Sequence, residues 1–196
     1  MHAYATETGA RKSVPLFIAA ASIGFTWFVD YLLSLWNVVL PWWIEGPSIL
    51  GFYGLFYSIF DQKLWKISFV RRALKIPNLN GLWEGYVKSS YNNFQSELKA
   101  EMDIHQTWTK MSIAMRTQNS KGYSLNSMIV NTSNEMTLSF EFFNEPKTAA
   151  PSSMHMHRGT ARLSIDPNVK SLNGEYYTGR DRNNFGVLHF ERTKNN

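Results

Sequence analysis

The stretch NLNGLWEGYV, residues 78–87, decides how this chain folds. It follows a long apolar region and then five basic residues without an acidic one, Lys63, Lys66, Arg71, Arg72 and Lys75. A Gly-x-Trp sequence at the start of a strand is typical of the first strand of a small closed β-barrel. The stretch therefore predicts that a barrel begins directly after a membrane segment.

Period-2 alternation and turn residues replace helical periodicity from Leu79 onward, and this pattern predicts strands. We predict eight of them, at 81–91, 95–107, 110–118, 122–131, 135–144, 154–166, 171–180 and 184–193. Short, evenly spaced strands favour an eight-stranded antiparallel up-and-down (lipocalin-like) barrel over residues 79–196, with a β-sandwich as the alternative. Side chains nearly fill such a barrel, or leave room for one small ligand.

The two ends of the predicted barrel differ in polarity. Successive strands of a meander run in opposite directions, so each inward-facing residue can be assigned to an end. One end collects the apolar residues Trp83, Trp108, Met111, Leu163, Ile165, Leu172 and Phe190. The opposite end collects Thr117, Asn144, His157, Thr178 and Arg180, with Asn126 or its neighbour Tyr123. We expect Trp83 to close the apolar end, next to the membrane segment.

A polar end over an apolar floor is a common arrangement for a small-molecule site. Burying Arg180 or His157 without a partner would cost several kcal/mol, about 2–7 for an uncompensated polar group, which favours a ligand there. Arg180 could pair bidentately with a phosphate, and Tyr123 or Tyr176 could stack on a base. The alternative is that these residues lie on a solvated rim.

Two apolar segments precede the barrel and predict a helical hairpin in a membrane. No Lys or Arg occurs from Ser13 to Phe60. About 20 apolar residues suffice to span a bilayer as a helix. After an N-terminal segment (1–13), we predict spans at 14–36 and 48–70, a connector at 37–47 and a basic linker at 71–78. A cleaved signal peptide is a poorer interpretation, because the first segment is long and a second follows.

The basic residues predict the orientation of the hairpin. Arg11 and Lys12 precede the first span and the basic cluster follows the second, whereas the connector has no Lys or Arg. The positive-inside rule then places both termini and the barrel in the cytoplasm. Asp30 is unusual, because an ionisable residue within a span is costly and often functional. It could serve assembly with other helices, or lie near the lipid–water interface.

Composition and motifs argue against several other functions. The chain has no cysteine, which excludes disulfides and Cys-based zinc sites. His155-x-His157 has ligand spacing, but no third ligand is evident, so we predict no metal and no other cofactor. No nucleophile elbow, P-loop or H-E-x-x-H motif occurs, so we predict no enzymatic activity. Residues 76–196 carry 13 basic and 11 acidic side chains, which gives little support for DNA or RNA binding.

The order of motifs resembles a known family. After the two spans and the basic patch come NLNGLWEGYV, IHQTWTKMSIAMRTQNSKGYS, LSFEFFNEP, MHRGTARLSI and LNGEYYTGRDRNNFGVLHFER. Together they resemble the two-transmembrane β-barrel effectors of bacterial CBASS antiphage systems. The resemblance covers the chain from about residue 14.

The resemblance implies a function and partners. It implies that the barrel binds a cyclic dinucleotide made by a partner nucleotidyltransferase, that the spans then self-associate, and that the bacterial inner membrane is disrupted. The ligand site would lie at the polar end of the barrel. Two alternatives remain from the residues alone: a membrane-tethered lipocalin-like carrier of an apolar ligand, and a plain scaffold with a filled barrel.

Overall fold

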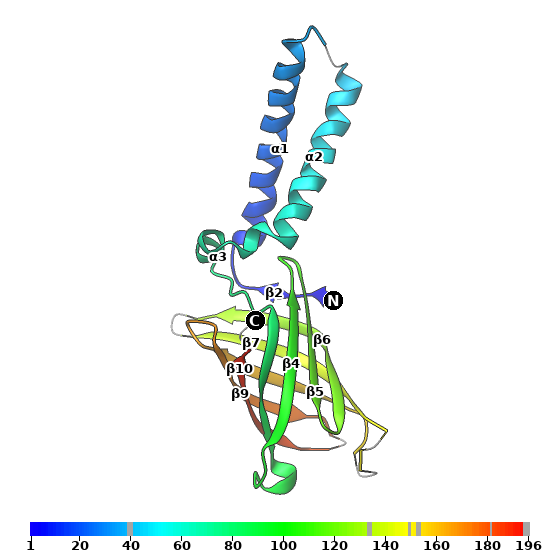
Figure 1. Cartoon of the computed structure of the whole chain (residues 1–196), viewed down its shortest axis with the longest axis vertical. Coiled ribbons are helices and arrows are strands. Elements are labelled where there is room, and N and C mark those ends of the chain that lie inside the picture. Colours follow the sequence, from blue (N-terminus) through cyan, green and yellow to red (C-terminus); the bar gives the residue numbers. More distant parts are fainter. Residues whose placement is uncertain (39–40, 133–134, 149, 152–153, 181, 194–196) are drawn as a thin grey trace. The chain divides into compact units, whose positions relative to one another are not determined.

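The computed structural model describes residues 1–38, 41–132, 135–148, 150–151, 154–180 and 182–193 of the chain. It divides into two compact units (Figure 1). One unit is helical and comprises Thr8–Lys75. The other comprises Met1–Glu7 together with Ile76–Asn196 and contains the strands. Each unit is described below by itself.

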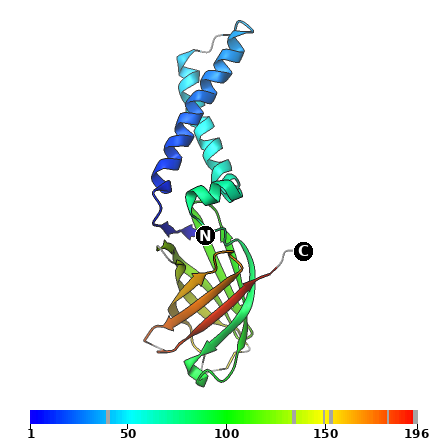
Figure 2. The same cartoon turned by 90° about the vertical axis from the view of Figure 1, so that its left-hand side faces the viewer.

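The helical unit is built on a hairpin of two long helices. Helix α1 spans Ala10–Ser34 and α2 spans Trp42–Gln62, and they lie side by side in both side views (Figures 1 and 2). Aromatic rings hold them together, because the ring of Phe25 packs edge-on against Phe52 and Phe56, with centroids 4.7 and 5.4 Å away. A short 3₁₀ turn, η1 (Leu64–Lys66), and helix α3 (Ser68–Leu74) follow.

Only one helix in the described part of the chain, α1, is long and apolar enough to span a membrane. Helix α2 begins earlier than the predicted second span, so Trp42 and Trp43 belong to it and not to the connector. It also ends earlier, because the chain leaves the helix at Lys63 and α3 begins at Ser68. A continuous helix over 48–70 is therefore not observed, and a second span remains a prediction.

Asp30 lies on a polar stripe of α1. Ser22, Thr26 and Asp30 are spaced four residues apart and so share one helix face. Ser22 and Thr26 are buried, and each hydroxyl donates to the carbonyl one turn earlier, at 2.7 and 2.9 Å. Asp30 itself is partly exposed. A role for it in assembly stays a prediction.

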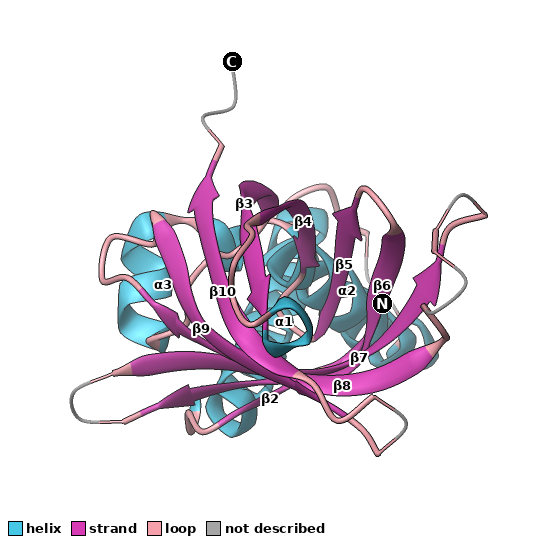
Figure 3. Cartoon of the chain, turned by 90° about the horizontal axis from the view of Figure 1, so that it is seen from below, coloured by secondary structure: helices cyan, strands magenta, loops and turns pink. Residues whose placement is uncertain are grey.

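The second unit is a closed antiparallel β-barrel (Figure 3). Its strands are β3 (Gly81–Ser89), β4 (Leu98–Gln106), β5 (Lys110–Thr117), β6 (Ser120–Asn131), β7 (Met136–Pro146), β8 (His157–Ile165), β9 (Ser171–Thr178) and β10 (Phe185–Arg192). Each pairs with the next in sequence, and β10 pairs with β3 to close the ring. The predicted eight-stranded up-and-down barrel is confirmed, and the alternative of a sandwich is excluded.

Two very short strands near the N-terminus were not predicted from the sequence. They are β1 (His2–Ala3), which is antiparallel to β5, and β2 (Ala5–Thr6), which is parallel to β6. β5 and β6 pair with each other only near their shared turn, from Ala114↔Tyr123 to Arg116↔Lys121. Residues 2–6 thus lie between the diverging parts of these strands. Five residues are too few for a periodic pattern to reveal them.

Both glycines of the stretch 78–87 meet a steric requirement. Gly81 has φ +125°, in the region that side-chain-bearing residues rarely adopt. At Gly85 a Cβ atom would lie 1.8 Å from the backbone oxygen of His189, on the neighbouring strand β10. The stretch therefore allows β10 to approach β3 closely where the barrel closes.

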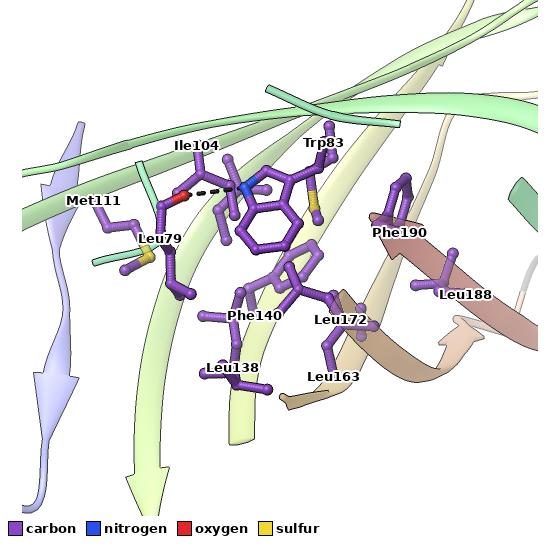
Figure 4. Close-up of a cluster of buried hydrophobic side chains, with 14 of the residues drawn as sticks. Leu79, Trp83, Ile104, Met111, Leu138, Phe140, Leu163, Leu172, Leu188 and Phe190 are labelled. Atoms are coloured by element: carbon purple, nitrogen blue, oxygen red, sulfur yellow. Dashed lines mark hydrogen bonds between the residues drawn. The ribbon is translucent and has the colours of Figure 1, made fainter. Parts of the chain in front are cut away.

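The apolar end of the barrel is filled with side chains (Figure 4). Trp83, Leu79 and Phe190 are fully buried. The Trp83 indole Nε1–H donates to the Leu79 carbonyl at 3.0 Å, which satisfies its polar atom in this apolar setting. We call this filled end, where β3 begins, the floor, and the opposite end the mouth.

We predict that Gly85→Ala lowers the free energy of unfolding of the barrel by at least about 2 kcal/mol, because the added methyl forces β3 and β10 apart. Gly179→Ala is the matched control, since a Cβ there would lie 3.6 Å from the nearest atom, the Arg158 oxygen. Thermal unfolding followed by tryptophan fluorescence measures both. Equal melting temperatures for the two variants would contradict the close approach.

Candidate functional site

A cavity of about 330 Å³ opens at the mouth of the barrel. Its deep wall is apolar and includes Val87, Met115 and Leu188. Its remaining wall is mostly polar or aromatic and comprises Ser89, Tyr91, Asn92, Ser96, Thr117, Asn119, Ser120, Phe142, Asn144, His157, Tyr176, Thr178, Arg182 and Asn184, with Leu98, Pro151 and Met154. Aromatic rings, amides, hydroxyls and one arginine are the groups that bind a small polar molecule with flat rings.

The rings of Phe142 and Tyr176 pack together at one side of the cavity. The Phe142 ring packs edge-on against Tyr176 and His157, with centroids 6.4 and 6.5 Å apart. Glycines make room for both rings: a Cβ at Gly159 would lie 2.4 Å from the Phe142 ring, and one at Gly186 would lie 2.4 Å from the Tyr176 ring. Burial raises the pKa of Tyr176 further above its usual value, so its hydroxyl stays protonated near pH 7.

Thr117 and Thr178 line the cavity, and their hydroxyls also form hydrogen bonds with residues just beyond the ends of their own strands, at the mouth. The Thr117 hydroxyl accepts from the Ser120 backbone N–H at 3.1 Å and lies 2.9 Å from the Ser120 hydroxyl. The Thr178 hydroxyl donates to the Asn184 carbonyl at 3.0 Å and accepts from the Asn184 N–H at 2.8 Å. These bonds hold Ser120 against the end of β5 and Asn184 against the end of β9, at the mouth.

The charges of the cavity suit an anion. The described lining contains one arginine, Arg182, and no carboxylate. The guanidinium of Arg182 also lies over the Tyr91 ring, 5.6 Å from its centroid. Burial lowers the pKa of His157, the positive charge of Arg182 lowers it further, and the hydrogen bond between Nδ1 and the His155 carbonyl partly opposes both. His157 is therefore neutral near pH 7, and an anion beside it would favour protonation.

Five of the eight residues predicted for a ligand site line the cavity together: Thr117, Asn144, His157, Tyr176 and Thr178. The other three lie outside its lining. Tyr123 is exposed on the outer face against Phe143, and the Asn126 amide donates to Glu141 at 2.9 Å, also on the outer face. Arg180 is exposed in the β9–β10 turn, whereas Arg182 lines the cavity.

The three predicted site residues that lie outside the cavity lining were misplaced for local structural reasons. β6 has an irregularity between Ser124 and Asn126, which disturbs the alternation that assigned its faces. β9 ends at Thr178, so Arg180 and Arg182 lie outside the strands, where alternation no longer predicts the direction of a side chain. Tyr91 and Asn92 lie on the 3₁₀ turn η2 (Ser90–Asn92), whereas the predicted first strand extends to residue 91 and the predicted break begins at Asn92. No metal-binding group of three or more ligands occurs in the described residues, and His155 is exposed.

Comparison with known families decides the classification. A family model described as "Cap15, cyclic dinucleotide receptor domain" matches residues 74–192, which include all eight barrel strands. A second, "Cap15, TM helices", matches residues 12–66. The chain belongs to the Cap15 family.

Curated relatives support the same placement of this Cap15 family member. It is 33% identical over 146 residues to the CD-NTase-associated protein 15 of Yersinia aleksiciae, covering 72% of this chain and 68% of the relative. It is 24% identical over 161 residues to the protein of the same name from Staphylococcus schleiferi, covering 79% of this chain and 87% of the relative. The resemblance to CBASS two-transmembrane β-barrel effectors is thereby confirmed.

The lowered pKa of His157 predicts a pH effect on stability. Between the folded-state pKa and the usual value near 6.5, the unfolded chain binds the proton more readily, so stability falls as pH is lowered through this window. We expect the melting temperature of the wild type to fall relative to that of His157→Gln between pH 8 and pH 5. A difference that does not change with pH, or changes in the opposite direction, would contradict the buried setting of His157.

Proposed function

We propose that this Cap15 family member is a membrane-anchored CBASS effector whose barrel binds a cyclic dinucleotide made by a partner nucleotidyltransferase. One observation carries the proposal: the barrel matched by the receptor-domain model has a polar mouth cavity that combines an arginine with aromatic rings and amides. A cyclic dinucleotide presents two phosphates and two flat bases. The cavity offers groups for both.

Each group of the cavity has a role in this proposal. Arg182 pairs with a phosphate, and His157 becomes protonated beside it. Tyr91 and Tyr176 stack on bases, since base–aromatic stacking contributes about 1–3 kcal/mol per base. Asn144, Thr117 and Thr178 donate to or accept from base edges and the ribose. We assign no ligand contact to Tyr123, Asn126 or Arg180.

The membrane part of the proposal rests on the helical unit. We infer that α1 and α2 both enter the bacterial inner membrane, with both termini and the barrel cytoplasmic. The support is the family model for transmembrane helices, the apolar length of α1, and the basic residues that flank the hairpin. Ligand binding drives self-association of the hairpins, in which Asp30 takes part, and the assembled helices disrupt the bilayer.

The alternative of a carrier for an apolar ligand is less well supported. The barrel interior near the floor is occupied by Trp83, Met102, Leu163 and other fully buried side chains. The cavity that remains has its polar groups at the mouth. The cavity itself argues against a scaffold with a filled barrel. A receptor without enzymatic activity is the function that these features favour.

Arg182→Ala should weaken binding of a cyclic dinucleotide about tenfold or more, because a charge-assisted hydrogen bond contributes about 1.5–3 kcal/mol. Arg180→Ala is the matched control, two residues away and outside the cavity lining, and should bind like the wild type. Calorimetric titration of the full chain in detergent, with a panel of purine and pyrimidine cyclic dinucleotides, measures both. The assignment fails if Arg180→Ala is the variant that loses affinity.

The effector activity is tested in vesicles of bacterial phospholipids. The full chain should depolarise them when the tightest-binding member of the panel is added, and Arg182→Ala should need a correspondingly higher concentration. Absence of depolarisation with every member of the panel would refute the proposed function.

A further inference from the structure

The N-terminal segment, residues 2–6, occupies a slot in the barrel wall. β5 and β6 form direct ladder pairs only over three positions beside their turn. Nearer the floor, β5 pairs instead with His2 and Ala3, and β6 pairs with Ala5 and Thr6. The segment is drawn in blue beside these strands in Figure 1. It satisfies strand edges that would otherwise be open at this point of the ring.

Side chains fix the segment in this slot. Tyr4 is 6% exposed and belongs to the barrel core. The Nε2 atom of His2 lies 2.7 Å from the Ser124 hydroxyl, and this hydroxyl also accepts from the Ile113 N–H at 2.9 Å. Ser124 lies at the irregularity of β6, so the position where β6 departs from regular pairing is also where the segment is held.

The buried side-chain amide of Gln106 bonds to both parts of the barrel unit that flank the helical unit in sequence, the N-terminal segment and the residues just after α3. Gln106 is 1% exposed, and its Nε2–H donates to the Tyr4 hydroxyl at 3.1 Å. Its Oε1 accepts from the Leu79 N–H at 2.8 Å. Tyr4 lies six residues before α1 and Leu79 lies five residues after α3. Gln106 therefore binds the chain both before and after the helical unit.

The same two strands line the ligand cavity at their other ends. Met115 and Thr117 of β5 and Ser120 of β6 belong to the cavity wall. Lys110 and Met111 of β5 pair with the N-terminal segment. β5 therefore runs over eight residues from the slot, at Lys110, to the mouth, at Thr117.

We propose that the slot between β5 and β6 is a strand-binding site whose occupant is residues 2–6 of this chain, and that ligand binding releases this occupant. The inference rests on the proposed function, because it makes the segment the element that reports cavity occupancy to α1. A ligand that draws the β5–β6 turn inward narrows the slot, so the ligand-bound barrel holds the segment less tightly. A ligand shifts such an equilibrium only through this difference in affinity.

A disulfide that retains the segment tests the proposal. Ala3 and Lys110 are paired in register and exposed, and the chain has no cysteine of its own. In Ala3→Cys/Lys110→Cys, oxidation should lock the segment in place. We expect the locked full chain to bind the tightest cyclic dinucleotide of the panel more weakly than the wild type, because a segment that the ligand releases must in turn oppose ligand binding. We also expect it to lose depolarisation of vesicles at least tenfold even at saturating ligand, with recovery on reduction.

A second disulfide is the matched control. Glu101→Cys/Arg116→Cys joins β5 to its other neighbour, β4, at a paired and exposed position. Its oxidation should leave depolarisation unchanged. Adding the ligand before oxidation should also slow disulfide formation in Ala3→Cys/Lys110→Cys and not in the control.

The outcomes separate this inference from the proposed function. Full depolarisation by the locked chain overturns the inference and leaves the proposed function intact. Failure of the 3–110 disulfide to form in the ligand-free chain overturns the strand register and the inference with it. A wild type that neither binds nor responds to any member of the panel refutes the proposed function, and therefore also the inference.

Discussion

The barrel depends on the buried side chain of Gln106, because this amide binds the chain on both sides of the helical unit. Its oxygen accepts from Leu79 and its nitrogen donates to Tyr4, so neither buried polar group is left unsatisfied. An unpaired buried donor or acceptor costs about 1–3 kcal/mol, which makes this pair of bonds a strong constraint. The carbonyl oxygen of Leu79 in turn accepts from the indole N–H of Trp83, whose side chain fills the floor. The stretch 78–87 thus does more than begin a strand, because it also joins the segment that follows α3 to the floor.

The up-and-down topology places apolar side chains at the floor of the barrel and polar side chains at the mouth. Every second strand begins at the floor, so apolar residues at alternate strand starts and ends collect there, and polar residues collect at the mouth. The floor is dense enough to exclude a ligand, and the mouth retains a cavity with one arginine in its described lining. In the proposed function, the ligand binds at the mouth, far from the floor. β5 and β6 line the cavity and also pair with the N-terminal segment, and we propose that they carry the signal.

Much of this arrangement could be predicted from the sequence, and the exceptions have physical reasons. Strand periodicity gave all eight barrel strands and the correct face for Thr117, Asn144, His157, Tyr176 and Thr178. It could not place Arg182, because the direction of a side chain in a turn depends on local dihedral angles and not on alternation. It could not find residues 2–6, whose strand conformation is imposed by the open edges of β5 and β6. Hydropathy predicted a span through Val70, but the chain leaves the helix at Lys63, where basic residues begin.

Hydrogen exchange of the full chain, with and without the tightest-binding cyclic dinucleotide, tests the central claim that the ligand binds at the mouth. A ligand at the mouth should slow exchange at the strand ends around Thr117–Ser120 and Tyr176–Thr178, with no added protection at Leu79–Trp83. Added protection confined to Leu79–Trp83, with the mouth unchanged, would show instead that the ligand binds at the floor.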